Sequence, residues 1–571
     1  MPTNNMIVSL RGALRSCRTH FVAAFWFQGF VAVSALAYPL YMIQVYERVI
    51  PSRNVGTLLA LLTGAALVIV LSGTFDYLNR KLRLAASLRV DRLLASKTLA
   101  ALFLRNSSER SDTGGQVLRD LGIARNFYTR VAPDAITGLP WATLFLGVLF
   151  YINFLVGIAA LICLGIECAL TALNVVATKR SREEAVEAGA RSQRMIEANL
   201  RSSDSIVAMG ILPRFLAKWQ RVDDAAMNAE AKGGTLSSAF SAISSVLSTI
   251  MRLSILSVAA VAIMAGALSP GFAFAVIIAF SLMMRPLKDI VRAWEQYPEA
   301  KASAGRVDAV LSAYPDQGER TVLPRPKGEV TCRRAVFMAP GGERILLGGI
   351  SFGIAPGSAV GIVGAIGSGK TTLARLLVGL QPPTRGEVRI DGTEAALWDR
   401  EQLGRYIGYL PQDIGLIAGT VAENIGRLGM FDDQQIVAAA ELAGAHNIIS
   451  KLPQGYDTLI GEGGVPLSGG QKQLVGLARA IAGSPSVVVL DEPNSNLDGP
   501  GENALLQCVQ ALKAKGCTVI LISHRPSIVQ TLERVILIKE GAVAFDGPVS
   551  DFFEASGRPA IRVIKANEAQ T

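Results

Sequence analysis

Six long apolar stretches in the first half of the chain constrain its fold more than any other feature. A helix needs about 20 mostly apolar residues to cross the hydrocarbon core of a bilayer, and each stretch is long enough to do so. The stretches cover residues 21–43, 55–75, 136–154, 155–177, 246–268 and 270–288. The third and fourth are nearly continuous, so residues 151–154 must form a very tight turn. The sequence therefore predicts a membrane domain of six helices over residues 1–316.

Basic residues give these helices a predicted orientation. Arg80 and Arg83 follow the second stretch, and Lys179 and Arg180 follow the fourth. Since Lys and Arg are enriched in cytoplasmic loops, both loops are expected in the cytoplasm. Each loop is nearly sixty residues long and rich in helix-forming residues. The outward loops are short, and residues 269–271 make up almost the whole of the last one. We therefore predict two long helical extensions on the cytoplasmic side and no separate domain outside.

Composition excludes other classes of protein. The net charge is +10, but no basic patch is interleaved with aromatic residues, so we expect no nucleic-acid partner. We attribute the charge to the Lys and Arg residues that membrane proteins keep in their cytoplasmic loops, and expect a lipid bilayer as the partner. The basic N-terminus resembles a signal peptide. Its cleavage would leave an odd number of helices, so the first stretch is expected to be retained. None of the six cysteines forms a Cys-x-x-Cys pair, so neither a zinc site nor a disulfide framework is predicted.

A glycine-rich segment in the second half predicts a phosphate-binding loop. Residues 364–372 read Gly-Ala-Ile-Gly-Ser-Gly-Lys-Thr-Thr, after the apolar strand 358–363 and before a predicted helix. This setting distinguishes a real phosphate loop from a chance match. Lys370 is expected to reach the β- and γ-phosphates of ATP, and Thr371 to hold Mg²⁺. The residues of the loop expected to contact ATP are Gly364, Gly367, Ser368, Gly369, Lys370, Thr371 and Thr372.

Two further apolar strands end in side chains suited to phosphate chemistry. The strand 487–490 runs into Asp491, which we expect to hold Mg²⁺ through water, and Glu492, which we expect to polarise the attacking water. The strand 518–523 ends at His524. Ligands bind at this end of parallel strands, so His524 is predicted to contact the γ-phosphate.

A short motif identifies the family that this half of the chain resembles. Leu467-Ser468-Gly469-Gly470-Gln471 opens a helix predicted over 472–482, and a helix N-terminus attracts anions. Together with the phosphate loop, this motif resembles the ABC transporter ATPases. In that family the serine and glycines bind the γ-phosphate of ATP held by the opposite subunit. The resemblance therefore implies a homodimer with two shared ATP sites, contacted by Ser468, Gly469, Gly470 and Gln471.

The resemblance implies roles for four further positions. Gln412 resembles the family's residue that contacts Mg²⁺ and assists catalysis, and Asp498 the loop that contacts ATP across the dimer. Glu462 resembles a contact that couples the ATPase domain to the membrane domain of exporters. The family's adenine-stacking tyrosine is absent, and Ala339-Pro340 stands in its place. Either Phe337 substitutes for the tyrosine or adenine is held loosely.

The predicted architecture is that of an ABC exporter: a six-span α-helical membrane domain followed by an α/β P-loop nucleotide-binding domain. A helical arm is expected over 291–313, and prolines mark a linker over 317–327. The ATPase domain is expected over 328–560, and a C-terminal tail over 561–571.

Three stretches resemble one subgroup, the transporters of type I protein secretion without an N-terminal peptidase-like domain (PrtD type). These stretches are residues 40–53, 139–145 and 491–498. The resemblance implies a multi-pass protein of the bacterial inner membrane, with its ATPase domain in the cytoplasm. It implies ATP-driven export of unfolded polypeptides with C-terminal signals. The implied partners are a periplasmic adaptor (membrane fusion) protein and an outer-membrane channel protein.

Alternative functions are a lipid or multidrug exporter of the same architecture, and an ATP-gated channel or regulator. The presence of both Glu492 and His524 argues against the channel or regulator.

Two charged residues interrupt the predicted spans. A carboxylate at Glu167, near the middle of the fourth span, costs several kcal/mol unless it is paired, hydrated or protonated. Glu167 therefore either faces the transport path or pairs with another helix. Arg252, near the cytoplasmic end of the fifth span, either lines the same path or extends its side chain to the membrane surface.

Overall fold

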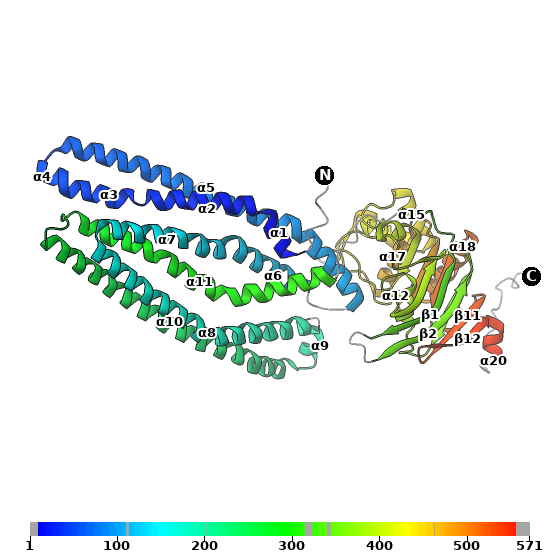
Figure 1. Ribbon diagram of the computed structural model, residues 1–571. Coiled ribbons are helices and arrows are strands. Elements are labelled where there is room, and N and C mark those ends of the chain that lie inside the picture. The colour runs from blue at the N-terminus through cyan, green and yellow to red at the C-terminus, as the bar shows by residue number, and fades with distance from the viewer. Residues whose placement is uncertain are drawn as a thin grey trace, which may run out of the picture. The chain divides into compact units, whose positions relative to one another are not determined.

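The computed structural model describes residues 9–109, 114–200, 202–313, 322–339, 344–461 and 463–555. The chain divides into two compact units, residues 1–316 and 317–571, and each has its own hydrophobic core (Figure 1). Glu462, the predicted tail 561–571 and the first part of the predicted linker lie outside the described residues.

The described part of unit 1 consists of helices joined by short connections. Figure 1 shows the longest of them running side by side, and α8 with α10, α7 with α11 and α2 with α5 pack most extensively. The α-helices are α1 (Leu10–Ser16), α2 (Arg18–Ser34), α3 (Ala37–Gln44), α4 (Ile50–Ser52), α5 (Val55–Glu109), α6 (Gly114–Asn126), α7 (Ala132–Ile152), α8 (Phe154–Leu200), α9 (Ser203–Ala208), α10 (Leu212–Met264) and α11 (Phe272–Ala313). Two π-helical turns, η2 (Val45–Val49) and η3 (Phe127–Val131), interrupt them.

Five segments of the described chain are long and apolar enough to cross a membrane. They are Arg18–Ser52, Val55–Ser107, Gly115–Ile152, Phe154–Leu200 and Leu212–Met264. The first, second and fourth predicted spans lie wholly within these segments, whereas the third and fifth predicted spans extend two and four residues beyond theirs. The sixth predicted span coincides with the start of α11, but Arg285, Lys288 and Asp289 interrupt its apolar run. The number of spans therefore stays a prediction.

The tight turn predicted over residues 151–154 is confirmed. Asn153 is extended, with φ −161° and ψ 135°, and separates α7 from α8. Its side-chain oxygen accepts hydrogen bonds from the backbone N–H of Leu155 at 2.9 Å and of Val156 at 3.4 Å. The two helices then pack closely, because a Cβ added to Gly157 would lie 2.3 Å from Cδ1 of Phe150. Asn153 thus caps one membrane helix directly after another ends.

The predicted helical extensions are also confirmed. Helix α5 continues without a break to Glu109 and α8 to Leu200, and α11 includes the whole arm predicted over 291–313. A buried carboxylate fixes the arm to α6. Asp120 accepts two hydrogen bonds from the Arg306 guanidinium, at 2.7 and 2.6 Å, and one from the Ser303 hydroxyl at 2.9 Å.

Unit 2 is built on a six-stranded sheet in the order β12-β11-β3-β10-β9-β6. All neighbouring strands are parallel except the edge pair β11 and β12. These strands are β3 (Ala359–Gly364), β6 (Ile407–Leu410), β9 (Val487–Asp491), β10 (Thr518–Ile522), β11 (Arg534–Lys539) and β12 (Ala542–Pro548). An antiparallel sheet has the order β2-β1-β4-β5, with β1 (Val330–Met338), β2 (Ile345–Ile354), β4 (Arg385–Ile390) and β5 (Thr393–Glu394). A third, two-stranded sheet pairs β7 (Gly419–Thr420) with β8 (Leu459–Ile460).

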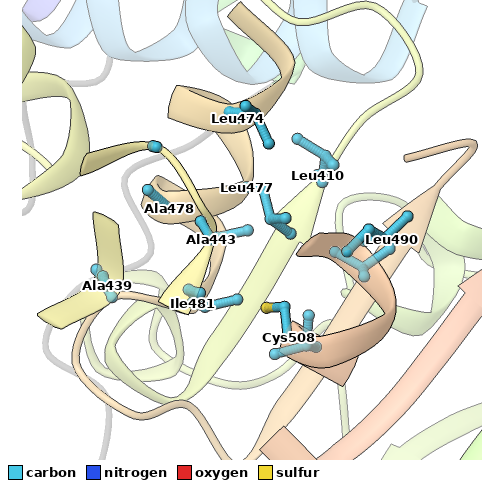
Figure 2. Close-up of a cluster of buried hydrophobic side chains, with 14 of the residues drawn as sticks. Leu410, Ala439, Ala443, Leu474, Leu477, Ala478, Ile481, Leu490 and Cys508 are labelled. Atoms are coloured by element: carbon cyan, nitrogen blue, oxygen red, sulfur yellow. The ribbon is translucent and has the colours of Figure 1, made fainter. Parts of the chain in front are cut away.

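Two apolar clusters enclose the central sheet of unit 2. Every residue of β9 and β10 is buried, as expected for parallel strands covered on both faces. Figure 2 shows one cluster, in which Leu477 and Ile481 of α17 (Gly469–Ile481) face Cys508 of α18 (Gly499–Ala514) and Leu490 of β9. The other cluster includes α12 (Lys370–Leu377). The remaining helices are α13 (Arg400–Tyr406), α14 (Val421–Ile425), α15 (Asp433–Leu442), α16 (His446–Ile449), α19 (Pro526–Val529) and α20 (Val549–Ala555), with the 3₁₀ turn η4 (Gly455–Asp457).

The cysteines of unit 2 belong to these cores. Cys332, Cys508 and Cys517 are free and buried. Burial raises the pKa of each thiol to about 12.

Candidate functional site

The sheet topology of unit 2 brings the separate sequence motifs to one edge. Strands β3, β10, β9 and β6 are adjacent and parallel, so their carboxyl ends lie together, where such sheets bind ligands. Ile522 pairs with Asp491 across β10 and β9, and Leu410 pairs with Leu490 across β6 and β9. The phosphate loop, Gln412, Glu492 and His524 each follow one of these strand ends.

The phosphate loop has the shape of an anion cradle. Gly364 ends β3, and Gly367 and Gly369 have φ values of 80° and 97°, which favour glycine. Lys370 begins α12 and folds back over the loop, where its Nζ donates hydrogen bonds to the carbonyls of Gly364 at 2.9 Å and Ala365 at 2.8 Å. The Ser368 hydroxyl is buried without a hydrogen-bond partner among the described residues. The loop therefore offers a helix N-terminus, a lysine and an unsatisfied hydroxyl to a phosphate.

Asp491 provides an unpaired carboxylate beside this loop. The residue is 1% exposed, and neither carboxylate oxygen has a hydrogen-bond partner within the described part of the chain. Burial raises the pKa of Asp491, and the charge of Glu492 raises it further, whereas the Thr371 hydroxyl and the charge of Lys370 oppose the shift. A buried carboxylate with free oxygens, close to a threonine hydroxyl, fits the oxygen ligands that Mg²⁺ requires. Asp491 and Thr371 are the residues that would hold the ion.

Glu492 is held in a strained position between two other site residues. Its φ is 50°, a left-handed conformation that is costly for a glutamate, and its N–H donates to the Ile522 carbonyl at 3.0 Å. One carboxylate oxygen accepts a hydrogen bond from Nε2 of Gln412 at 3.2 Å. The other lies 3.5 Å from Nδ1 of His524. The three residues predicted to be catalytic are therefore in contact.

Helix α17 begins at Gly469, three residues earlier than the predicted start at 472. The reason is a capping box around the first turn. The Ser468 hydroxyl accepts a hydrogen bond from the Gln471 N–H at 3.3 Å, and the Gln471 side chain accepts one from the Ser468 N–H at 2.9 Å. The two glycines are thus part of the first helical turn, and Ser468 and Gly469 are exposed.

Asp498 has a similar local role at the next helix. Its side chain accepts a hydrogen bond from the Gly501 N–H at 3.0 Å and caps α18. The predicted contact of Asp498 across a dimer stays a prediction.

Sequence reasoning missed Gln473, which joins α17 to the loop after Glu492. Gln473 is 1% exposed; its Nε2 donates to the Pro493 carbonyl at 2.7 Å, and its Oε1 accepts from Nδ2 of Asn496 at 3.3 Å. A polar residue on the otherwise apolar face of a predicted helix was the available signal.

Arg427 was also missed. Its half-buried guanidinium donates to four carbonyls, namely those of Arg479 and Ala480 near the end of α17, Ile407 at the start of β6 and Gly404 in α13. Burial, and to a smaller extent the charge of Arg479, lower the pKa of Arg427 to about 10. Arg427 therefore links the C-terminal end of α17 to the start of β6. Ser468 lies at the opposite end of α17, and Gln412 follows the opposite end of β6. No motif in the sequence marks this arginine.

The remaining predicted residues lie on elements other than the strands that form this sheet edge. Phe337 lies on β1, half-buried against the apolar cluster of the antiparallel sheet. Glu167 of α8 is buried, accepts a hydrogen bond from the Ser244 hydroxyl of α10, and leaves its second oxygen without a partner in the described chain. Arg252 is exposed and folds back along α10 to the Ser248 carbonyl and the Thr249 hydroxyl, both at 3.2 Å.

Two family models match the two units. Residues 21–287 match the ABC transporter transmembrane region, and residues 347–495 match the ABC transporter family.

The sequences of two named bacterial proteins align with most of this chain. The type I secretion system ATP-binding protein PrsD of Rhizobium meliloti (strain 1021) is 34% identical over 538 residues, which are 94% of this chain and 92% of PrsD. The alpha-hemolysin translocation ATP-binding protein HlyB of Escherichia coli is 28% identical over 94% of this chain and 76% of HlyB. Among solved structures, a bacterial Atm1-family ABC exporter with ATP bound has the same fold, with a TM-score of 0.80 over 95% of this chain and 96% of that chain at 23% identity.

Proposed function

The chain belongs to the ABC transporters of type I secretion systems, and from this premise we propose that it hydrolyses ATP to export unfolded polypeptides with C-terminal signals across the bacterial inner membrane. The observation that carries the proposal is the contact of Glu492 with Gln412 and His524 beside the unpaired Asp491. A chain that only bound ATP would have no need of this arrangement. The lipid or multidrug exporter and the channel or regulator are less well supported, because the relatives that match nearly the full length of this chain are named as secretion or translocation proteins.

The chemistry assigns a role to each group at the sheet edge. The phosphate loop binds the phosphates through its backbone N–H groups, and Lys370 turns from its own loop carbonyls to the β- and γ-phosphates. Mg²⁺ bound by Thr371, Asp491 and Gln412 would neutralise phosphate charge. Glu492 orients and polarises the attacking water, Gln412 holds the Glu492 carboxylate, and His524 contacts the γ-phosphate.

A second copy of the chain completes each site in this proposal. Ser468 and Gly469 are exposed, and within the described residues no hydrogen bond joins them to the phosphate loop of the same chain. A homodimer places Ser468 and the first turn of α17 against the γ-phosphate bound by the partner, with Asp498 nearby. ATP then closes the dimer, and hydrolysis reopens it. Glu462 couples this motion to the membrane domain.

Export beyond the inner membrane requires other proteins. The connections predicted to face outward are short, such as Asn153 and residues 265–271 between α10 and α11. They offer no domain that could bridge the periplasm, which supports a periplasmic adaptor and an outer-membrane channel as partners.

Within the membrane unit, the proposed roles of the two charged residues differ. The bond between Glu167 and Ser244 supports a structural role for Glu167 between α8 and α10. The orientation of Arg252 along its own helix supports extension towards the cytoplasmic surface.

The test is a comparison of secreted proteins from cells carrying the wild-type chain or Lys370→Ala. We expect a defined set of external polypeptides to disappear with Lys370→Ala and to persist with Lys539→Ala, which removes an exposed lysine at the end of β11. An unchanged set of external proteins would refute export as the function.

A further inference from the structure

A hollow at the N-terminal bend of unit 1 has no role in ATP hydrolysis or export as proposed. Helices α1 and α2 meet at Cys17, where φ is −96° and ψ is 8°. Beside this bend lies an open hollow of about 450 Å³, lined by Leu14, Arg15, Arg18, Phe21, Val22 and Phe25. Its lining therefore consists of apolar side chains and two arginines.

The two arginines lack a carboxylate partner. Arg15 and Arg18 are exposed and form no ion pair within the described residues. The carboxylate of Asp308 reaches the start of α1, where it accepts a hydrogen bond from the Leu10 N–H at 2.9 Å and, in the described part of unit 1, forms no ion pair with either arginine. Two guanidinium groups thus face solvent at one end of an apolar hollow, where they would pair strongly with a phosphate.

An apolar track continues from the hollow along the first membrane segment. Val22, Trp26, Phe30 and Val33 are 49%, 65%, 40% and 50% exposed. Their spacing of four, four and three residues places them on one face of α2. The Phe25 side chain that lines the hollow is held in place by α7, because its ring packs against Trp141 with centroids 5.4 Å apart. The surface therefore combines a cationic end with an apolar path long enough for an acyl chain.

We propose that this surface binds an anionic phospholipid of the cytoplasmic leaflet. The phosphate lies between Arg15 and Arg18, and an acyl chain follows the hollow and the track from Val22 to Val33. The location agrees with this chemistry, because α2 enters the membrane directly after Arg18, at the depth where headgroups meet acyl chains. A free phosphate ion would leave the apolar walls exposed to water, and a zwitterionic lipid would bring a positive charge to the arginines.

Native mass spectrometry of the purified full-length chain tests the proposal. The protein is reconstituted in nanodiscs of phosphatidylcholine with a minor fraction of phosphatidylglycerol, and the lipids retained on release are counted. We expect the wild-type chain to retain phosphatidylglycerol in preference to phosphatidylcholine, and Arg15→Gln with Arg18→Gln to reduce that retention about tenfold or more. The matched control is Arg11→Gln with Arg89→Gln, two exposed arginines that do not line the hollow. The control should retain lipid like the wild-type chain.

Three results would overturn the proposal: equal retention by the Arg15/Arg18 variant, an equal loss in the control, or no preference for phosphatidylglycerol. A change in dimer mass on size-exclusion chromatography, without lipid retained by the wild-type chain, would assign the surface to a second copy and would also refute it. A second variant, Val22→Asn with Phe30→Asn, keeps both arginines and should weaken retention by disrupting the track. The readout needs neither ATP nor an exported polypeptide, so its failure leaves the export proposal standing.

Discussion

At the scale of single residues, the site depends on side chains held where they would otherwise be unfavourable. Asp491 is a carboxylate without a partner, and Glu492 has a left-handed backbone. A buried carboxylate with free oxygens lowers stability, whereas a site that binds a cation requires one. The left-handed backbone of Glu492 directs its carboxylate between Gln412 and His524.

Replacing Glu492 by Gln should lower ATP hydrolysis by about 10²- to 10⁴-fold and leave ATP binding intact, because the amide cannot polarise water but can occupy the same position. Phosphate release and nucleotide binding measure the two effects. Glu540→Gln is a matched control, since Glu540 also has a positive φ, 52°, but lies in the turn after β11. Retention of normal hydrolysis and export by Glu492→Gln would contradict the proposed catalytic role.

The raised pKa of Asp491 predicts how Mg²⁺ binding depends on pH. A carboxyl whose pKa is raised on folding stabilises the nucleotide-free unit when protonated, and this contribution is lost as pH rises from the ordinary value of 3.8 through the raised value. Mg²⁺ then replaces the proton. Thermal stabilisation by Mg²⁺ with a non-hydrolysable ATP analogue should therefore grow as pH rises through this window. Asp491→Asn should remove this growth, and the same pH dependence in that variant would contradict the assignment.

Arg427→Met should destabilise unit 2 by about 3 kcal/mol, because four carbonyls lose their donor at a half-buried position. Thermal unfolding of the full-length chain would show a fall of several degrees in the transition of that unit. The exposed Arg405→Met, which breaks only a 3.9 Å surface ion pair with Glu401, should have almost no effect. An unchanged transition in Arg427→Met would show that the guanidinium bonds are not needed for stability.

At the scale of elements, helix α17 combines a structural cap with a proposed binding role, and a substitution can separate them. Ser468→Asp keeps an N-cap acceptor, so stability should change little, but its charge should repel the γ-phosphate and abolish hydrolysis. Asp432→Ala removes the equivalent cap of α15 and should cost about 1 kcal/mol of stability with hydrolysis retained. Hydrolysis at the normal rate in Ser468→Asp would exclude the phosphate contact.

Elements were predictable from the sequence where local chemistry decides them. The turn at Asn153 follows from two apolar runs that are together too long for one span, and β9 and β10 follow from short apolar runs that prove to be fully buried. The start of α17 was placed late because glycines disfavour helices, whereas the reciprocal bonds of Ser468 and Gln471 overcome that preference. Arg427 could not be predicted, because the carbonyls that it binds come from α13, β6 and α17, whereas the signal for Gln473 was its polar side chain on an apolar helix face.

At the scale of the whole molecule, the proposed dimer makes a prediction that no single chain can satisfy. Lys370→Ala and Ser468→Asp should each be inactive alone, but a mixed dimer would contain one site with the intact Lys370 of one chain and the intact Ser468 of its partner. Co-expression of the two variants, purified through different tags, should restore part of the ATPase activity. If the mixed dimer forms and stays as inactive as either variant, each chain must complete its own site.

The described thiols make this transporter convenient for spectroscopy. Cys168 is exposed, whereas Cys17, Cys163, Cys332, Cys508 and Cys517 are all buried. Since the thiolate is the reactive form, the three in unit 2, with pKa values of about 12, should resist maleimide labels at neutral pH. A fluorophore attached to an introduced surface cysteine in unit 2 could then report on closure of the ATPase halves without removal of the native cysteines of that unit.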